Sequence, residues 1–189
     1  MAKKSPPLPS EPPAPEFSRP VDVTTLPASG LQREIAATPA ECEALARRFD
    51  LPGIGALTAR LAIGPIRSGG AAGARVIGHF SARVSQICVL SLEPFESEIS
   101  EPIELDLLPP ESIPDGADAD SHLNQSVEPL EGHVFDLGEL VAQHLSLALD
   151  PYPRRSGVSF ASEPGITGES DALARPKPFA ALGDLKRKM

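Results

Sequence analysis

Basic side chains are missing from the middle of this 189-residue chain: no Lys or Arg lies between Arg83 and Arg154. Residues 84–153 hold 15 acidic side chains, and the formal net charge of the whole chain is −9. A protein that grips phosphate backbones usually presents a basic face, because the release of counterions supplies much of its affinity. We therefore expect the central segment to repel nucleic acid, and we expect no DNA partner.

Cysteines and long apolar runs are also scarce. Cys42 and Cys88 are the two cysteines, too few for a disulfide framework, and both are expected to be free thiols. No apolar run approaches the ~18 residues that a membrane span needs. The N-terminus has two lysines but no apolar segment typical of a secretion signal. The sequence thus predicts a cytoplasmic protein that does not contact a membrane.

Proline and small polar residues divide the chain. Six of the eleven residues 5–15 are proline, which favours a disordered, extended tail over residues 1–16. Residues 17–153 are predicted to form a single domain that contains a mobile acidic loop at about 111–125. Residues 154–189 are predicted to be a flexible tail, because few large apolar side chains there could offset the entropy of ordering.

Two segments have the pattern of capped helices. In "TPAECEALARRFD", Thr38 is the predicted N-cap and Glu41 completes a capping box. In "FDLGELVAQHLSLALDPYP", Asp136 is the predicted N-cap, Glu139 completes a second box, and Pro151 ends the helix. Asp136 and Glu139 could also be read as an acid/base pair, but capping explains both residues.

Apolar and polar residues alternate in three other segments, residues 57–63, 74–84 and 98–107. Such alternation is typical of antiparallel strands that are covered on one face only. The outward positions of the third strand include Glu98, Glu104 and Asp106. The predicted fold is therefore α+β, with an antiparallel sheet or partial barrel packed against two main helices.

Four segments, in this order and at this spacing, carry a resemblance to a known family: "EFSRPVDV", "CVLSLEPF", "EPLEGHVFDLGELVAQHLSLALDPYPR" and "KPFAALGDLKRK". Together they resemble the bacterial large ribosomal RNA subunit accumulation protein family, YceD. The resemblance implies a cytoplasmic, non-enzymatic ribosome biogenesis factor that supports the accumulation of large-subunit (23S) rRNA. The partner it implies is a large-subunit rRNA precursor or a basic ribosomal protein.

Cys88 departs from a pattern of this family. Many members have a C-x-x-C pair where this chain has Cys88 and, three residues later, Ser91. A closed zinc site needs four Cys or His ligands, and thiolates usually arrive in such pairs. We therefore predict no metal and no cofactor, and interpret Cys88 as a small buried apolar side chain. The chain also lacks a nucleophile elbow or a phosphate-binding loop, so no catalytic residue is predicted.

Two surfaces are candidate partner-binding sites. The acidic strand face could hold a basic protein, because complementary fields raise association rates; alternatively, its carboxylates only keep the surface solvated and blunt edge strands against aggregation. The second surface is the basic pair after the second helix together with an amphipathic motif at 176–188, which should fold only against a groove, either of its own domain or of a ribosomal partner. The candidate residues are Glu98, Glu104 and Asp106 on the strand, Arg154 and Arg155 after the helix, and Phe179, Leu182, Leu185, Lys186, Arg187 and Lys188 in the motif.

Other interpretations remain open. Four arginines on polar strand positions could approach RNA or could be ordinary solvated surface: Arg60, Arg67, Arg75 and Arg83. The main alternative function is that of an acidic holder, or chaperone, of a basic protein unconnected with ribosomes. An unrecognised hydrolase or metal enzyme is the third class.

Overall fold

The computed structural model describes residues 15–68, 70–113 and 126–158. The chain divides into two units, residues 1–155 and 156–189, and the first is described below. Most of the predicted Pro-rich tail, most of the predicted acidic loop and the whole amphipathic motif at 176–188 lie outside the described residues. Those assignments stay predictions.

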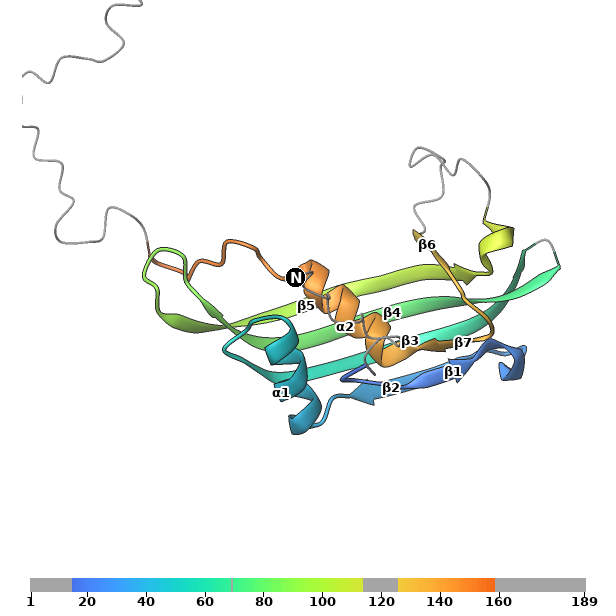
Figure 1. The fold of residues 1–189 in the computed structure, drawn as a ribbon, viewed down its shortest axis with the longest axis horizontal. Coiled ribbons are helices and arrows are strands. Elements are labelled where there is room, and N and C mark those ends of the chain that lie inside the picture. The colour runs from blue at the N-terminus through green and yellow to red at the C-terminus, as the bar shows by residue number, and fades with distance from the viewer. Residues whose placement is uncertain (1–14, 69, 114–125, 159–189) are drawn as a thin grey trace, which may run out of the picture. The chain divides into compact units, whose positions relative to one another are not determined.

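A five-stranded sheet forms the centre of the first unit (Figure 1). Its order is β2 (Leu31–Ala36), β3 (Gly53–Ser68), β4 (Ala71–Ile87), β5 (Pro94–Leu108) and β6 (Ser126–Pro129). Neighbouring strands from β2 to β5 are antiparallel, whereas β6 runs parallel to the last four residues of β5. A separate two-stranded sheet pairs β1 (Pro20–Asp22) with β7 (Val134–Asp136).

Two helices, α1 (Pro39–Arg48) and α2 (Leu137–Ala148), begin where the sequence predicts. At α1 the Thr38 hydroxyl accepts from the Glu41 N–H at 3.3 Å, and the Glu41 carboxylate accepts from the Thr38 N–H at 2.7 Å. At α2 the Asp136 carboxylate accepts from the N–H groups of Gly138 and Glu139. Single 3₁₀ turns are η1 (Val23–Thr25) and η2 (Pro110–Ser112). Neither described α-helix is long and apolar enough to cross a membrane.

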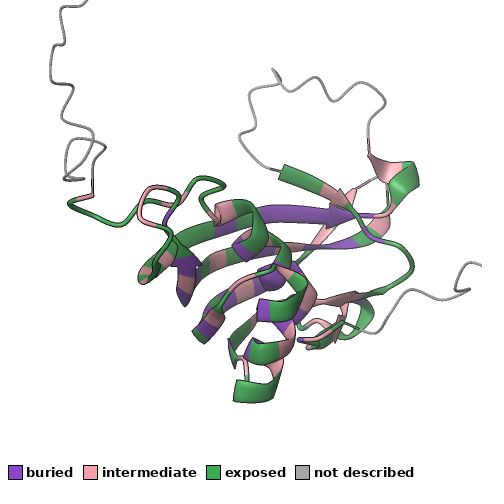
Figure 2. Cartoon of the chain, turned by 60° about the vertical axis from the view of Figure 1, so that its left-hand side comes forward, coloured by how far each residue is buried: buried purple, intermediate pink, exposed green. Residues whose placement is uncertain are grey.

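The core lies between the helices and one face of the sheet. Buried side chains of α1 and α2 join a single cluster with alternate residues of β3, β4 and β5, such as Leu61, Phe80 and Leu105. Figure 2 shows the resulting alternation of buried and exposed positions along the strands. The predicted α+β class with a sheet covered on one face is confirmed, and the parallel strand β6 is an addition that the sequence pattern did not predict.

Candidate interaction surface

The sheet face turned away from the helices, called the open face below, carries mainly small, polar and charged side chains, and Ile77 is an exposed apolar exception. Cross-strand register aligns Thr58, Ser81 and Ser100 across β3, β4 and β5, and the hydroxyls of the two serines lie 3.2 Å apart. A shallow hollow of about 250 Å³ surrounds this row and includes Arg83 and Glu98, which face each other in the same register. Short side chains at the centre leave the backbone of this face close to solvent.

Exposed carboxylates line β5. Glu98 and Glu104 point to solvent as the alternation predicts, and Glu96 and Glu101 on the same strand are also exposed. β5 contains no Lys or Arg. Among the described residues, no ion pair forms at Glu96, Glu98 or Glu101. Two of these four glutamates, Glu98 and Glu104, were named as candidates from the sequence. All four belong to the 15 acidic side chains counted in residues 84–153.

Asp106 lies on the outward face of the sheet, as the alternation predicts, but the expectation that it is exposed to solvent is wrong. Its side chain is only 12% exposed, because Arg75 lies directly opposite on β4 and donates through Nε and Nη2 to the two carboxylate oxygens, both at 2.7 Å. The hydrogen bonds to Asp106 raise the pKa of Arg75 above its usual value. On its other side Asp106 pairs with Val127 of β6. Asp106 therefore stabilises the sheet, and it is not part of the open acidic surface.

The four strand arginines proposed as RNA contacts also differ from one another. Arg60 donates through Nε to the Glu34 carboxylate of β2 at 3.1 Å. Arg75 pairs with Asp106 of β5. Two of the four positive charges are thus offset by carboxylates on adjacent strands, which weakens the open face as a phosphate-binding surface.

The basic pair after α2 lies beside the turn between β4 and β5. Arg154 is exposed, whereas Arg155 donates through Nη1 to the Glu93 carboxylate at 3.0 Å. The Arg155 backbone N–H also points at the Cys88 sulfur, 3.4 Å away. One member of the pair therefore fixes the chain to the turn, and the partner-binding role of both stays a prediction.

Cys88 is a free thiol with no exposed surface, in agreement with its predicted burial. Its surroundings are more polar than an apolar core position. Hydrogen bonds from the Ser91 hydroxyl, then from backbone N–H groups including those of Ser91 and Arg155, lower the pKa of Cys88 to about 6, outweighing the opposing effect of desolvation. Within residues 15–68, 70–113 and 126–158, no three His, Cys, Asp or Glu side chains gather closely enough to hold a metal ion.

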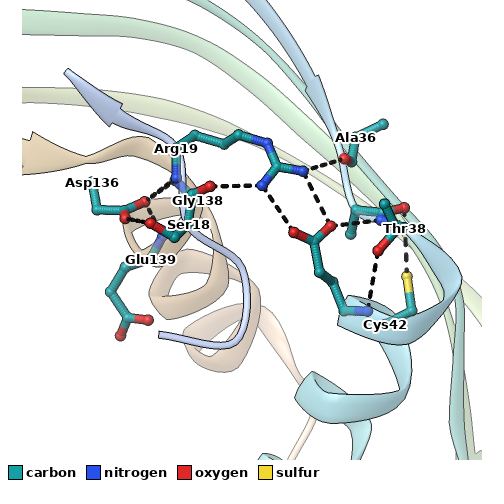
Figure 3. A network of polar contacts seen from close by, with 10 residues as sticks. Ser18, Arg19, Ala36, Thr38, Cys42, Asp136, Gly138 and Glu139 are labelled. Atoms are coloured by element: carbon teal, nitrogen blue, oxygen red, sulfur yellow. Dashed lines mark hydrogen bonds and ion pairs between the residues drawn. The ribbon is translucent and has the colours of Figure 1, made fainter. Parts of the chain in front are cut away.

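Arg19 joins the starts of the two helices, a role that the sequence pattern did not predict (Figure 3). Its backbone N–H donates to Asp136 at 2.7 Å, and the hydroxyl of Ser18 donates to the same carboxylate. Its guanidinium donates through Nη1 and Nη2 to the two oxygens of Glu41, at 2.8 and 3.1 Å, and through Nη2 to the Ala36 carbonyl at 3.2 Å. The hydrogen bond from Arg19 is the main cause that lowers the pKa of Glu41 to about 2. The segment "EFSRPVDV" was the only signal in the sequence for this position.

Glu139 differs from its prediction. Its carboxylate accepts from both terminal nitrogens of Arg48 on α1, at 2.8 and 2.7 Å, and from Gln143 at 3.3 Å. Of the predicted capping box at α2, the half made by the Asp136 side chain is present. The Glu139 side chain binds Arg48 and links the two helices instead. The Arg48 hydrogen bonds lower the pKa of Glu139. Asp136 and Glu139 therefore both make contacts that stabilise the fold.

A family model described as "Large ribosomal RNA subunit accumulation protein YceD" matches residues 76–186, more than half of the chain. The chain belongs to this family. Comparison with curated proteins and with solved structures finds no match.

The YceD match begins within β4 and contains β5, the Cys88 turn and α2. Arg19, Glu41 and Arg48 lie before it, although Arg19 and Arg48 bind the start of α2. The family is associated, by its description, with accumulation of the large ribosomal RNA subunit. Strand β5, with its exposed carboxylates, therefore lies inside the part of this chain that matches the YceD family.

Proposed function

We propose that this YceD protein is a non-enzymatic ribosome biogenesis factor of the cytoplasm, which supports accumulation of large-subunit (23S) rRNA by binding a component of the growing subunit. The observation that carries the proposal is the row of exposed carboxylates on strand β5 in a chain of this family. The role in rRNA accumulation rests on the family, and the choice of partner rests on the charge of β5.

A basic ribosomal protein fits this surface better than an rRNA precursor does. Glu96, Glu98 and Glu101 are exposed and form no ion pair with a described residue, so they would repel phosphates and attract Lys and Arg. Of the strand arginines, Arg60 and Arg75 are already paired with carboxylates. Contact with rRNA, where it occurs, is assigned to Arg154 and to the basic end of the motif at 176–188.

That motif is the second proposed contact. Phe179, Leu182 and Leu185 recur at three-residue spacing, and Lys186, Arg187 and Lys188 follow them. A short amphipathic segment of this kind can anchor a partner when it folds in a groove. A chain that ends at residue 175 should keep the fold and associate less with large-subunit particles, and Phe179→Ala should reproduce most of the effect. Normal association of both variants would remove the motif from the proposal.

Sedimentation of a lysate through a sucrose gradient tests the function. The protein should migrate with precursors of the large subunit, and deletion of its gene should lower the ratio of large-subunit to small-subunit rRNA. A protein that stays at the top of the gradient, together with an unchanged rRNA ratio in slow and fast growth, would contradict the proposal.

The acidic strand also favours a second candidate, a holder of a basic protein that has no connection with ribosomes. Complementary charge raises the association rate with any basic partner. Crosslinking followed by mass spectrometry separates the two candidates, because a biogenesis factor should crosslink to ribosomal proteins and a general holder to others.

A further inference from the structure

The edge of β5 is open along most of its length. β6 pairs only with Leu105 to Leu108, and none of the described strands pairs with that side of the stretch from Pro94 to Glu104. Backbone N–H and C=O groups of a strand alternate between its two sides, so about half of those in this stretch point away from β4. Such an edge can accept another extended chain by backbone hydrogen bonds.

The two faces of this edge differ in chemistry. Glu96, Glu98 and Glu104 lie on the open face and are exposed. On the helix-covered face, Phe95 and Ile99 are only half-buried, whereas Ile103 farther along the same strand is fully buried. The apolar face of the sheet is therefore incompletely covered where the edge is open, and the acidic face is directly above it.

We propose that an extended segment of a basic protein binds along Pro94 to Glu104 as an added strand. Its Lys or Arg side chains face Glu96, Glu98 and Glu104, and the apolar or β-branched side chains between them pack against Phe95 and Ile99. The inference rests on the proposed function for the class of partner and adds the mode of binding. Charge gives the fast encounter, and backbone pairing with period-two alternation gives the specificity.

Two other occupants fit less well. An RNA strand would bring phosphates against a row of carboxylates that no basic side chain of β5 offsets. A second copy of this chain would pair one acidic edge with another, and like charges that face each other across strands are destabilising. Only a basic polypeptide satisfies both the charge and the backbone groups of the edge.

The first test measures binding of a ten-residue peptide that alternates Lys with Val and Thr to the full chain, by calorimetry at low salt. A second peptide has the same side chains but N-methylated backbone amides. We expect the N-methylated peptide to bind at least about tenfold more weakly, since it keeps the charge and loses the donors. Equal affinities of the two peptides would overturn the added-strand mode.

Two sets of charge variants locate the site. Glu96→Gln, Glu98→Gln and Glu104→Gln together, the three acids that face the basic side chains of the added strand, should weaken peptide binding by about tenfold. The matched control combines Glu43→Gln, Glu111→Gln and Glu131→Gln, which remove the same charge from exposed positions outside β5. The control should change affinity by less than about twofold, since these positions do not contact the peptide. An equal loss in both sets would show that only net charge matters and would overturn the site.

Proline variants test the backbone directly. The backbone N–H groups of Ser100 and Glu101 point to opposite sides of β5. One of the two variants Ser100→Pro and Glu101→Pro therefore removes a hydrogen bond to β4, and the other removes a donor on the open edge. The variant that removes the donor on the open edge should keep the melting temperature of the original protein. Its affinity for the peptide should fall below that of Glu101→Gln. Unchanged binding by that variant would overturn the proposal, and the peptide pair above decides the matter on the unaltered protein if both variants unfold.

The binding mode and the function fail separately. Peptide binding at the edge with normal rRNA ratios in cells that carry the three-Gln edge variant would leave the binding mode intact and remove its proposed role. Loss of rRNA accumulation with no peptide binding at the edge would retain the function and overturn the mode.

Discussion

The carboxylates beside the helices and the exposed glutamates Glu96 and Glu98 of β5 have opposite surroundings. Glu41 and Asp136 accept hydrogen bonds from Arg19, and each also accepts from a backbone N–H at the start of a helix. Glu96 and Glu98 are exposed, and neither forms an ion pair with a described residue. The same type of side chain therefore has a structural role at Glu41 and Asp136, whereas Glu96 and Glu98 have no ion-pair partner among the residues that the structure describes.

This difference indicates where acidic residues can be changed without loss of the fold. Removing a carboxylate that satisfies several donors leaves those donors unpaired, and each unpaired donor costs about 1–3 kcal/mol when it is buried. Removing an exposed carboxylate among other carboxylates relieves repulsion. Stability should depend on the helix-side group, and association on the β5 group.

The largest effect should come from Gly138, whose N–H donates to Asp136. An added Cβ there would lie 2.2 Å from the Phe17 carbonyl oxygen. We expect Gly138→Ala to lower the free energy of unfolding by about 1–3 kcal/mol, because the segment that carries Arg19 would be pushed away. Denaturant unfolding measures the loss. Gly53→Ala is the control, since its Cβ would meet no atom within 4 Å; equal losses would mean that this contact does not hold the region together.

Acid should affect the helix side next. The pKa of Glu41 is lowered from 4.5 to about 2 in the folded state, chiefly by the Arg19 hydrogen bond. A carboxyl with a lowered pKa stabilises the fold fully above about pH 4.5, and this contribution is lost as the pH falls toward 2. Glu41→Gln should remove roughly 1–2 kcal/mol at pH 7 and flatten the decline of stability over that pH window.

Glu43→Gln is the matched control for this pH series. Glu43 lies on the same helix in an exposed pair with Arg47, so its loss should change stability by less than about 0.5 kcal/mol. An unaltered acid profile in Glu41→Gln would show that the Arg19 network does not contribute to stability.

Local sequence patterns predicted the structural features that depend on residues close together in the chain. The capping box of α1 joins residues three positions apart, and the alternation in β3, β4 and β5 identifies which residues face the helices. The strands are longer than predicted because residues such as Gly55 and Pro65 interrupt the apolar alternation without ending the backbone pairing. Pro102 is tolerated in β5, where one side of the strand is open.

Long-range contacts could not be predicted in this way. Ser18 and Asp136 are 118 positions apart, and the pairing of Arg75 with Asp106 depends on the register between β4 and β5. Period-two alternation places Asp106 outward but does not say what lies over it. The burial of Asp106 and the role of Arg19 therefore required the structure, whereas the acidic character of β5 did not.

A smaller effect distinguishes a partly buried ion pair from an exposed one on the outward face of the sheet. Asp106→Asn should lower stability by about 1 kcal/mol, because Arg75 loses a charged partner at a site only 12% exposed. The control is Glu34→Gln, which breaks a cross-strand pair with Arg60 whose side chains are 70% and 67% exposed. That loss should stay below about 0.5 kcal/mol. Similar values for the two variants would mean that burial does not set the strength of these pairs.

The smallest effect should come from the β5 edge itself. Replacing Glu96, Glu98 and Glu101 together by Gln should leave the free energy of unfolding within about 0.5 kcal/mol of the original protein, because these side chains are exposed and no described residue pairs with them. Their mutual repulsion is screened by salt, so added salt should stabilise the original protein more than the variant. Denaturant unfolding at low and high salt measures both quantities. A loss above about 1 kcal/mol would show that these carboxylates have structural partners, and the contrast between the two acidic regions would then disappear.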